Sequence, residues 1–247
     1  MVTNLLQRCG LFLGPEEELG FDSTNGEPHW ENIKFVALND KILSRLGGSW
    51  HRPPNFRPGW ERTHEMSDLT AAASKLINRF GARQPWGWKD PRNSLTLPFW
   101  RQLMPDLTVV ICVRNPLEVA ESLRVRGDLV ATPAIHLWQS YYRELLSAVP
   151  PSQRLVTHYE SYFENPLTEL QRLVSAIGMQ ASTETTSSVC AHVSEDLRHH
   201  RLQLSTINAP EIEALYKTLC REEHSELFQH DNECETVIGD LTPHELC

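Results

Sequence analysis

Hydrophobic residues follow two different patterns along the chain. Two short runs, residues 107–113 and 154–158, are largely aliphatic and β-branched, which predicts strands, and the first is apolar enough to be covered on both faces of a parallel sheet. Longer segments repeat an apolar residue every three or four positions, which predicts helices. The expected helices span about residues 5–13, 31–46, 69–80, 95–103, 134–146, 167–177, 185–193 and 211–228, and a further short strand is expected at 86–88.

Turn and loop signals organise these elements into one unit. Gly47 and Gly48 end the second helix, and the proline-rich residues 50–60 predict a loop. Neither an internal repeat nor a long linker divides residues 1–230, so we expect one domain, followed by an acidic and poorly ordered tail at 231–247. Strands that alternate with helices predict an α/β fold with three layers, α/β/α, around a central parallel sheet. Ligands in such folds bind beyond the carboxyl ends of the strands.

Composition narrows the class of protein. A chain of 247 residues that is 40% hydrophobic and 22% charged is ordinary for a globular enzyme domain. The formal net charge of −9 disfavours general nucleic-acid binding. No apolar run reaches the roughly 20 residues of a membrane span, and the N-terminus has no secretory signal pattern. The cysteines lack CxxC spacing, which disfavours a disulfide framework or a zinc site and favours the cytoplasm; they are Cys9, Cys112, Cys190, Cys220, Cys234 and Cys247.

An anion-binding pattern follows the first predicted strand. Arg114 comes where the strand ends, Asn115 can cap the next helix, and Pro116 fits its first turn, so a helix begins directly after the arginine. A helix N-terminus favours an anion by roughly 0.3–1 kcal/mol, and an arginine hydrogen bond to a charged oxygen adds about 1.5–3 kcal/mol. Together these groups predict a phosphate site. On this stretch alone, an ion pair of Arg114 with Glu118 or Glu121 explains the arginine equally well.

Three motifs in order resemble the nucleotide-binding half of the sulfotransferases that use 3′-phosphoadenosine 5′-phosphosulfate. The first is KDPR at residues 89–92, which is similar to the Lys-Asp-Pro segment of that family's bacterial and tyrosylprotein-directed branches. The second is Arg114 with its Asn-Pro pair and Ser122 eight positions on. The third is HYE at residues 158–160, followed by Asn-Pro at 165–166. The order of the three motifs is more specific than any one of them.

The resemblance implies a fold, a reaction and a set of roles. The fold would be the P-loop NTPase-like sulfotransferase fold, and the reaction would move a sulfuryl group from 3′-phosphoadenosine 5′-phosphosulfate to an acceptor hydroxyl or amine. Arg114 and Ser122 would bind the 3′-phosphate, and Tyr159 would lie near the adenine. Lys89 would stabilise the leaving oxygen, and no metal is required. Read singly, Lys89 is equally well a surface lysine, Ser122 a neutral helix residue and Tyr159 a core aromatic.

A carboxylate or histidine must accept the proton of the acceptor. Glu31, at the start of the second predicted helix, is our candidate for this base. The alternative is a first-turn glutamate that complements the helix dipole. His29 and Glu27 are weaker candidates in the same segment.

A cationic cluster and a set of tryptophans carry further expectations. Arg198, His199, His200 and Arg201 lie where the family often supplies a loop that contacts the 3′-phosphate, but the family's Arg-Lys-Gly version is missing, and a solvated helix end fits as well. Aromatic faces suit sugars and phenols, whereas most tryptophans belong to the core. Both explanations are open for Trp30, Trp50, Trp60, Trp86 and Trp88.

The sequence departs from the family at its start. The family begins with a strand and a glycine-rich loop that cradles the 5′-phosphosulfate, and residues 1–6 resemble the helix after that loop. We therefore expect the first strand to be missing and the donor to bind weakly. The alternative function is an N-terminally truncated, non-catalytic remnant that binds a nucleotide or a protein. A nucleotide kinase is disfavoured because there is no GxxxxGK[ST] loop. The acceptor stays open between a small molecule, a carbohydrate, a lipid and a peptide.

Overall fold

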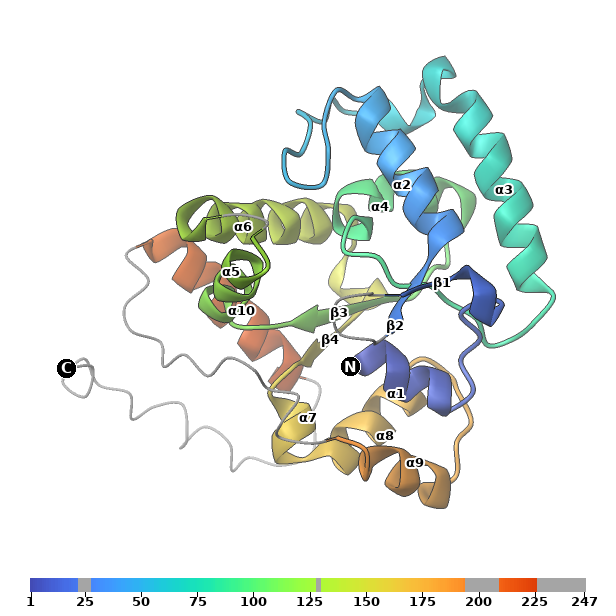
Figure 1. Ribbon diagram of the computed structural model, residues 1–247, viewed down its shortest axis with the longest axis vertical. Helices are drawn as coiled ribbons and strands as arrows, with labels where there is room; N and C mark the ends of the chain where they lie inside the picture. Colours follow the sequence, from blue (N-terminus) through green and yellow to red (C-terminus); the bar gives the residue numbers. More distant parts are fainter. Residues whose placement is uncertain (22–27, 128–129, 194–208, 226–247) are drawn as a thin grey trace.

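A two-stranded parallel sheet lies in the middle of the molecule (Figure 1). The structure is a computed structural model that describes residues 1–21, 28–127, 130–193 and 209–225. Strand β3 (Val109–Val113) pairs in parallel with β4 (Arg154–His158) over the full length of both strands. A separate antiparallel pair joins β1 (Leu19–Phe21) to β2 (Pro28–Asn32).

Helices make up most of the rest of the described chain. They are α1 (Val2–Arg8), α2 (Ile33–Arg45), α3 (Ser67–Gly81), α4 (Asn93–Leu103), α5 (Pro116–Val125), α6 (Ala131–Ala148), α7 (Ser161–Glu164), α8 (Pro166–Ala176), α9 (Thr183–Cys190) and α10 (Pro210–Ser225). None of the helices in the described part of the chain combines the length and the hydropathy that a membrane span requires.

Helices cover both faces of the β3–β4 sheet. Ile111 and Val113 pack with apolar residues of α4, α6 and α10, whereas Val110 and Leu155 pack with α1, α8 and α9. These two groups of helices lie on different sides of the strands in Figure 1. Since side chains alternate along a strand, one apolar strand can face both groups. The chain therefore has a mixed α/β structure with a small parallel sheet, and a larger central sheet stays a prediction.

Most of the expected elements are confirmed within a few residues. The strand at 154–158 is confirmed with the predicted bounds, and each expected helix has a counterpart. The expected strand at 86–88 is reduced to one parallel bridge between Trp86 and Phe12. The β1–β2 pair and the short helix α7 were not expected, because their sequences carry no clear alternation and no long apolar period.

The start of the second helix differs from the prediction. Glu31 lies in β2, and α2 begins at Ile33 because the Asn32 side chain accepts a hydrogen bond from the backbone N–H of Lys34 at 3.0 Å. Trp30, just before it, has a positive φ of 56°. The chain therefore turns sharply before the helix, and Glu31 is not part of its first turn.

The prediction that β3 is covered on both faces is wrong at one position. Ile111 and Val113 are buried, but the side chain of Cys112 is exposed. Cys112 lines a groove of about 710 Å³ between β3, α1 and the segment that carries Trp86 and Trp88. The face of β3 that carries Cys112 is therefore exposed to solvent at the carboxyl end of the strand, where the apolar sequence pattern predicted burial.

Candidate active site

The candidate site consists of two charged groups, one that lines the groove and one at the carboxyl end of β3. Lys89 follows the extended segment around Trp86 and lines the groove. Arg114 comes directly after β3, whose Cys112 lines the same groove. Tyr159 comes directly after β4, and its backbone N–H donates to the carbonyl of Val113 at 2.9 Å, which places it beside the end of β3. Arg114 and Tyr159 therefore lie at neighbouring strand ends as predicted, whereas Lys89 follows an isolated bridge and not a strand.

Lys89 and Glu31 form an ion pair across a long stretch of sequence. The Nζ atom of Lys89 lies 2.5 Å from Oε1 of Glu31. The Lys89 side chain is 42% exposed and that of Glu31 is 19% exposed, so the pair is held by the protein but reached by solvent. The alternative that Glu31 complements a helix dipole is wrong, because Glu31 lies in β2 and its carboxylate contacts Lys89 instead.

A buried polar network holds the segment that follows Lys89. Asp90 is 4% exposed, and one of its oxygens accepts from both the backbone N–H and Nη1 of Arg92, at 3.0 and 2.8 Å. Nε of Arg92 lies 2.7 Å from the carboxylate of Asp40 on α2. Burial lowers the pKa of Arg92, but the nearby Asp90 and Asp40 carboxylates outweigh it and raise the pKa overall, so this guanidinium keeps its charge. The KDPR segment is therefore fixed to α2 through the ion pair between Arg92 and Asp40.

Arg114 is held by two neighbours. Its Nε donates to Oε2 of Glu118 at 3.1 Å, and Glu118 is only 1% exposed. Its guanidinium carbon lies 4.4 Å from the ring centre of Tyr159, a cation–π contact. Among the described residues, neither Nη atom donates a hydrogen bond, so both can meet an anion. Glu121 pairs with Arg124 instead, so Glu118 is the carboxylate that holds Arg114.

Fewer contacts are described for the remaining predicted site residues. Ser122 lies half-buried on α5, where its carbonyl accepts from the N–H of Arg126. The structure records no contact between Ser122 and Arg114. His29 belongs to β2 by its backbone, and its side chain lies outside the described part, as does Glu27. The cationic cluster Arg198, His199, His200 and Arg201 also lies outside the described residues.

Sequence reasoning missed the roles of His158 and Glu160, which flank Tyr159. His158 is 6% exposed, and its Nδ1 lies 3.4 Å from Oε2 of Glu160. The ring of His158 also contacts Tyr216 of α10, with ring centres 5.7 Å apart. Burial, with the thiol of Cys220 and the carboxylate of Glu160 nearby, raises the pKa of Tyr216. Both missed residues belong to the HYE motif, so the signal was present but was assigned to the tyrosine alone.

The tryptophans around the groove belong to the aromatic core. Trp88 stacks on Phe35 at 4.5 Å between ring centres with an interplanar angle of 13°, and Trp60 is 6% exposed. Trp86 and Trp88 pack against the cluster of α2, α3 and α4 and also line the groove. The core explanation is therefore confirmed for Trp60, whereas Trp86 and Trp88 fit both explanations.

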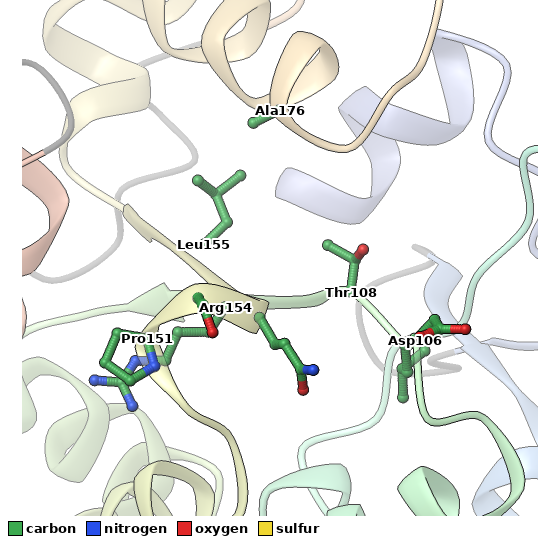
Figure 2. Close-up of a pocket in the computed structure, with 9 residues that line it drawn as sticks. Asp106, Thr108, Pro151, Arg154, Leu155 and Ala176 are labelled. Atoms are coloured by element: carbon green, nitrogen blue, oxygen red, sulfur yellow. The ribbon is translucent and has the colours of Figure 1, made fainter.

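A cavity of about 470 Å³ lies at the opposite edge of the β3–β4 sheet, at the amino ends of the strands (Figure 2). Arg154 lines it, at the amino end of β4. Its Nε and Nη2 donate to Glu222 at 2.5 and 2.7 Å, and Nη1 donates to the carbonyl of Val149 at 2.8 Å. Every nitrogen of this guanidinium is thus in use, unlike those of Arg114. The candidate site therefore stays at the carboxyl edge.

Across residues 1–21, 28–127, 130–193 and 209–225, no group of three or more His, Cys, Asp or Glu side chains is placed to hold a metal ion.

Comparison with known proteins gives one match. The model of the sulfotransferase family matches residues 35–183. No curated protein and no solved structure matches the chain significantly. The matched range contains Lys89, Arg114, Ser122 and Tyr159, whereas Glu31 lies just before it.

Proposed function

The chain belongs to the sulfotransferase family, and from that premise we propose that it moves a sulfuryl group from 3′-phosphoadenosine 5′-phosphosulfate to an acceptor hydroxyl or amine. The observation that carries this proposal is the 2.5 Å contact between Lys89 and Glu31 beside the groove. A cation for the leaving oxygen and a carboxylate for the incoming proton lie next to each other there. Small molecules, carbohydrates and peptides are all suitable acceptors for such a site.

In the proposed reaction the acceptor oxygen or nitrogen attacks the sulfur, and the bond from sulfur to the bridging oxygen breaks. The electron pair of that bond stays on the 5′-phosphate, giving 3′-phosphoadenosine 5′-phosphate. Lys89 stabilises this growing charge, since its ammonium is a cation whose N–H groups can donate to a developing oxyanion. Glu31 takes the proton from the acceptor. As in phosphoryl transfer, positioning and charge stabilisation supply most of the rate.

We assign nucleotide binding to Arg114 and the residues near it. The two Nη atoms of Arg114 would hold the 3′-phosphate, helped by the Ser122 hydroxyl and by the cluster Arg198, His199, His200 and Arg201. Tyr159 would carry the adenine. Asn115 caps α5 through a 2.9 Å hydrogen bond from Leu117, which leaves the helix N-terminus facing the same region as Arg114.

One observation favours the second candidate, a non-catalytic module that binds a nucleotide or a protein. Arg114 already has a buried carboxylate partner in Glu118 and an aromatic partner in Tyr159. Those contacts would be enough to give it a purely structural role at the junction of β3 and α5. The two candidates differ in whether sulfuryl transfer accompanies binding.

We extend the proposal to the fold and the compartment. The small parallel sheet supports a three-layer, P-loop NTPase-like arrangement, with residues 1–230 as one domain. The described cysteines are free thiols, which supports a reducing cytoplasm; they are Cys9, Cys112, Cys190 and Cys220.

The test is a calorimetric titration with 3′-phosphoadenosine 5′-phosphate, with AMP as the comparison ligand. We expect binding that prefers the 3′-phosphate. Arg114→Ala should weaken it by about 10- to 100-fold, the value of one charged hydrogen bond. Arg124→Ala is the matched control, because Arg124 lies on the same helix and pairs with the exposed Glu121. Equal affinity for the two nucleotides, or equal effects of the two substitutions, would refute the assignment.

A further inference from the structure

Asn39 of α2 is fully buried and lies at the centre of a polar cluster. Its Nδ2 donates to Oδ2 of Asp90 at 2.8 Å and to Oδ1 of Asn93 at 2.9 Å. Its Oδ1 accepts from Oγ1 of Thr96 at 2.7 Å and from Nε1 of Trp100 at 2.8 Å. An amide has two N–H donors and an oxygen with two lone pairs, so all of its hydrogen-bonding capacity is used.

The cluster joins the two chain segments that carry the ion pair. Asp90 follows Lys89 directly, and Glu31 precedes Asn32, which caps the helix that carries Asn39. A bond between Asn39 and Asp90 therefore fixes the Lys89 segment relative to the helix that starts beside Glu31.

A second link runs parallel to the first. Arg92 bridges Asp90 to Asp40, the next residue of α2 after Asn39. The hydroxyl of Tyr141 on α6 lies near these charges, and its pKa is raised mainly by burial. A carboxylate of α2 and the neutral hydroxyl of Tyr141 on α6 thus lie beside the turn. A buried network in which the central amide is satisfied specifies one arrangement.

We infer that Asn39 is a positioning residue, which sets the distance between Lys89 and Glu31 by holding the Asp90 turn against α2. This inference rests on the proposed function, because the pair matters for transfer only if Lys89 and Glu31 act in it. Asn39 touches neither member of the pair, so its effect passes through Asp90.

The test measures the pair directly by acetylating the folded protein with limiting acetic anhydride and quantifying each lysine by mass spectrometry. An ammonium held by a carboxylate is less available to the reagent and reacts slowly. The exposed Lys41 on α2 is the internal reference. Glu31→Gln should raise the ratio of Lys89 to Lys41 acetylation by about two- to fivefold, as expected for a partly exposed ion pair.

Asn39→Asp should raise the same ratio by a similar factor. It keeps the oxygen that Thr96 and Trp100 use but replaces both donors, and its charge repels Asp90. The double variant Asn39→Asp with Asp90→Asn reverses donor and acceptor and should restore the low ratio. Thr186→Val, a buried hydroxyl lost from the distant α9, should leave it unchanged.

An unchanged ratio in folded Asn39→Asp would overturn the inference, and so would an unchanged ratio in Glu31→Gln. If Asn39→Asp does not fold, Asn39→Ala removes the same two donated bonds, together with the two accepted ones, without adding a charge and is judged by the same ratio. Binding of 3′-phosphoadenosine 5′-phosphate is titrated on every sample. Failure of the wild-type protein to bind it would count against the proposed function and leave the acetylation result to judge Asn39 alone.

Discussion

The Lys89 group and the Arg114 group of the candidate site are held by different means. Lys89 is 42% exposed, and its partner Glu31 lies 58 residues away in sequence. Arg114 is 23% exposed, and its partner Glu118 lies one helical turn away and is buried. One group thus depends on distant segments that are packed together, whereas the other depends on a local turn and on the neighbouring strand.

This difference indicates that the Lys89 group and the Arg114 group have different roles. The Lys89–Glu31 pair is open to solvent on one side, so a substrate can reach it. Buried residues of α2 and α4 hold the segment that carries Lys89 in place. Arg114 lies over the ring of Tyr159. We therefore expect substitutions at the first group to change the rate of transfer and those at the second to change nucleotide affinity.

The largest effect is expected from Lys89→Ala. Loss of one preorganised donor to a developing charge lowers a rate constant by about 100- to 1,000-fold. Sulfuryl transfer from the donor to a panel of hydroxyl and amine acceptors measures it, with Lys41→Ala as the control. Affinity for 3′-phosphoadenosine 5′-phosphate should fall far less than it does in Arg114→Ala. If affinity falls as much as the rate, the division between the two groups is wrong.

Glu118→Gln tests how much the Arg114 group contributes to the stability of the fold. Glu118 is buried, and a hydrogen bond between charged groups contributes about 1.5–3 kcal/mol. We expect the free energy of unfolding in urea to fall by about that amount. Glu121→Gln, which breaks a more exposed pair on the same helix, should cost under about 1 kcal/mol. Similar losses for the two variants would mean that Glu118 gains nothing from its burial.

Tyr159→Leu should weaken nucleotide binding by about two- to tenfold, because a cation–π contact is worth about 0.5–1 kcal/mol at a partly exposed site and more when it is desolvated. Tyr159→Phe keeps the ring under Arg114 and should stay close to the wild-type affinity. Competition with a fluorescent adenine nucleotide measures both. Equal losses in the two variants would assign the effect to the hydroxyl and not to the ring.

The same contrast explains how much could be predicted from the sequence. The strand that ends at Arg114 and the cap at Asn115 are local signals, so the first was predicted closely, and the pairing with Glu118 was one of two alternatives. Glu31 and Lys89 were each named, but nothing local indicates that residues so far apart meet. Asn39 gave no signal at all, because an asparagine inside a helix is usually solvent-facing and only packing shows that it is buried.

The β1–β2 pair and the open face at Cys112 were missed for a related reason. A short strand in a two-stranded pair needs little apolar alternation, so Leu19–Phe21 looks like a loop. Conversely, the apolar run at β3 predicts burial on both sides, but the groove leaves Cys112 exposed. Sequence patterns report what a side chain prefers, and only the packing of distant segments decides what covers it.

The smallest expected effect concerns a support of the Lys89 group. Glu18 accepts two hydrogen bonds from Arg79 and one from Nδ2 of Asn32, the residue next to Glu31. Chiefly through the Arg79 bond, the pKa of Glu18 is lowered. A carboxyl whose pKa is lower in the folded state stabilises the fold above its unfolded pKa, and this contribution disappears as the pH falls through the folded pKa. Glu18→Gln should therefore cost about 0.5–1 kcal/mol near pH 7.

The difference in unfolding free energy between wild type and Glu18→Gln, followed by urea denaturation from pH 7 downward, should be constant until the pH nears the ordinary carboxyl range and should then shrink toward zero. Arg45 and Asp68 provide the control, since Asp68→Asn breaks a pair on the exposed surface of α2 and α3. Glu18→Gln, unlike Asp68→Asn, should also raise the acetylation of Lys89, because Glu18 accepts a hydrogen bond from Asn32 and Asp68 does not. An acetylation ratio that stays at the wild-type value would mean that Asn39 and the Asp90 turn hold the Lys89 group without help from β2.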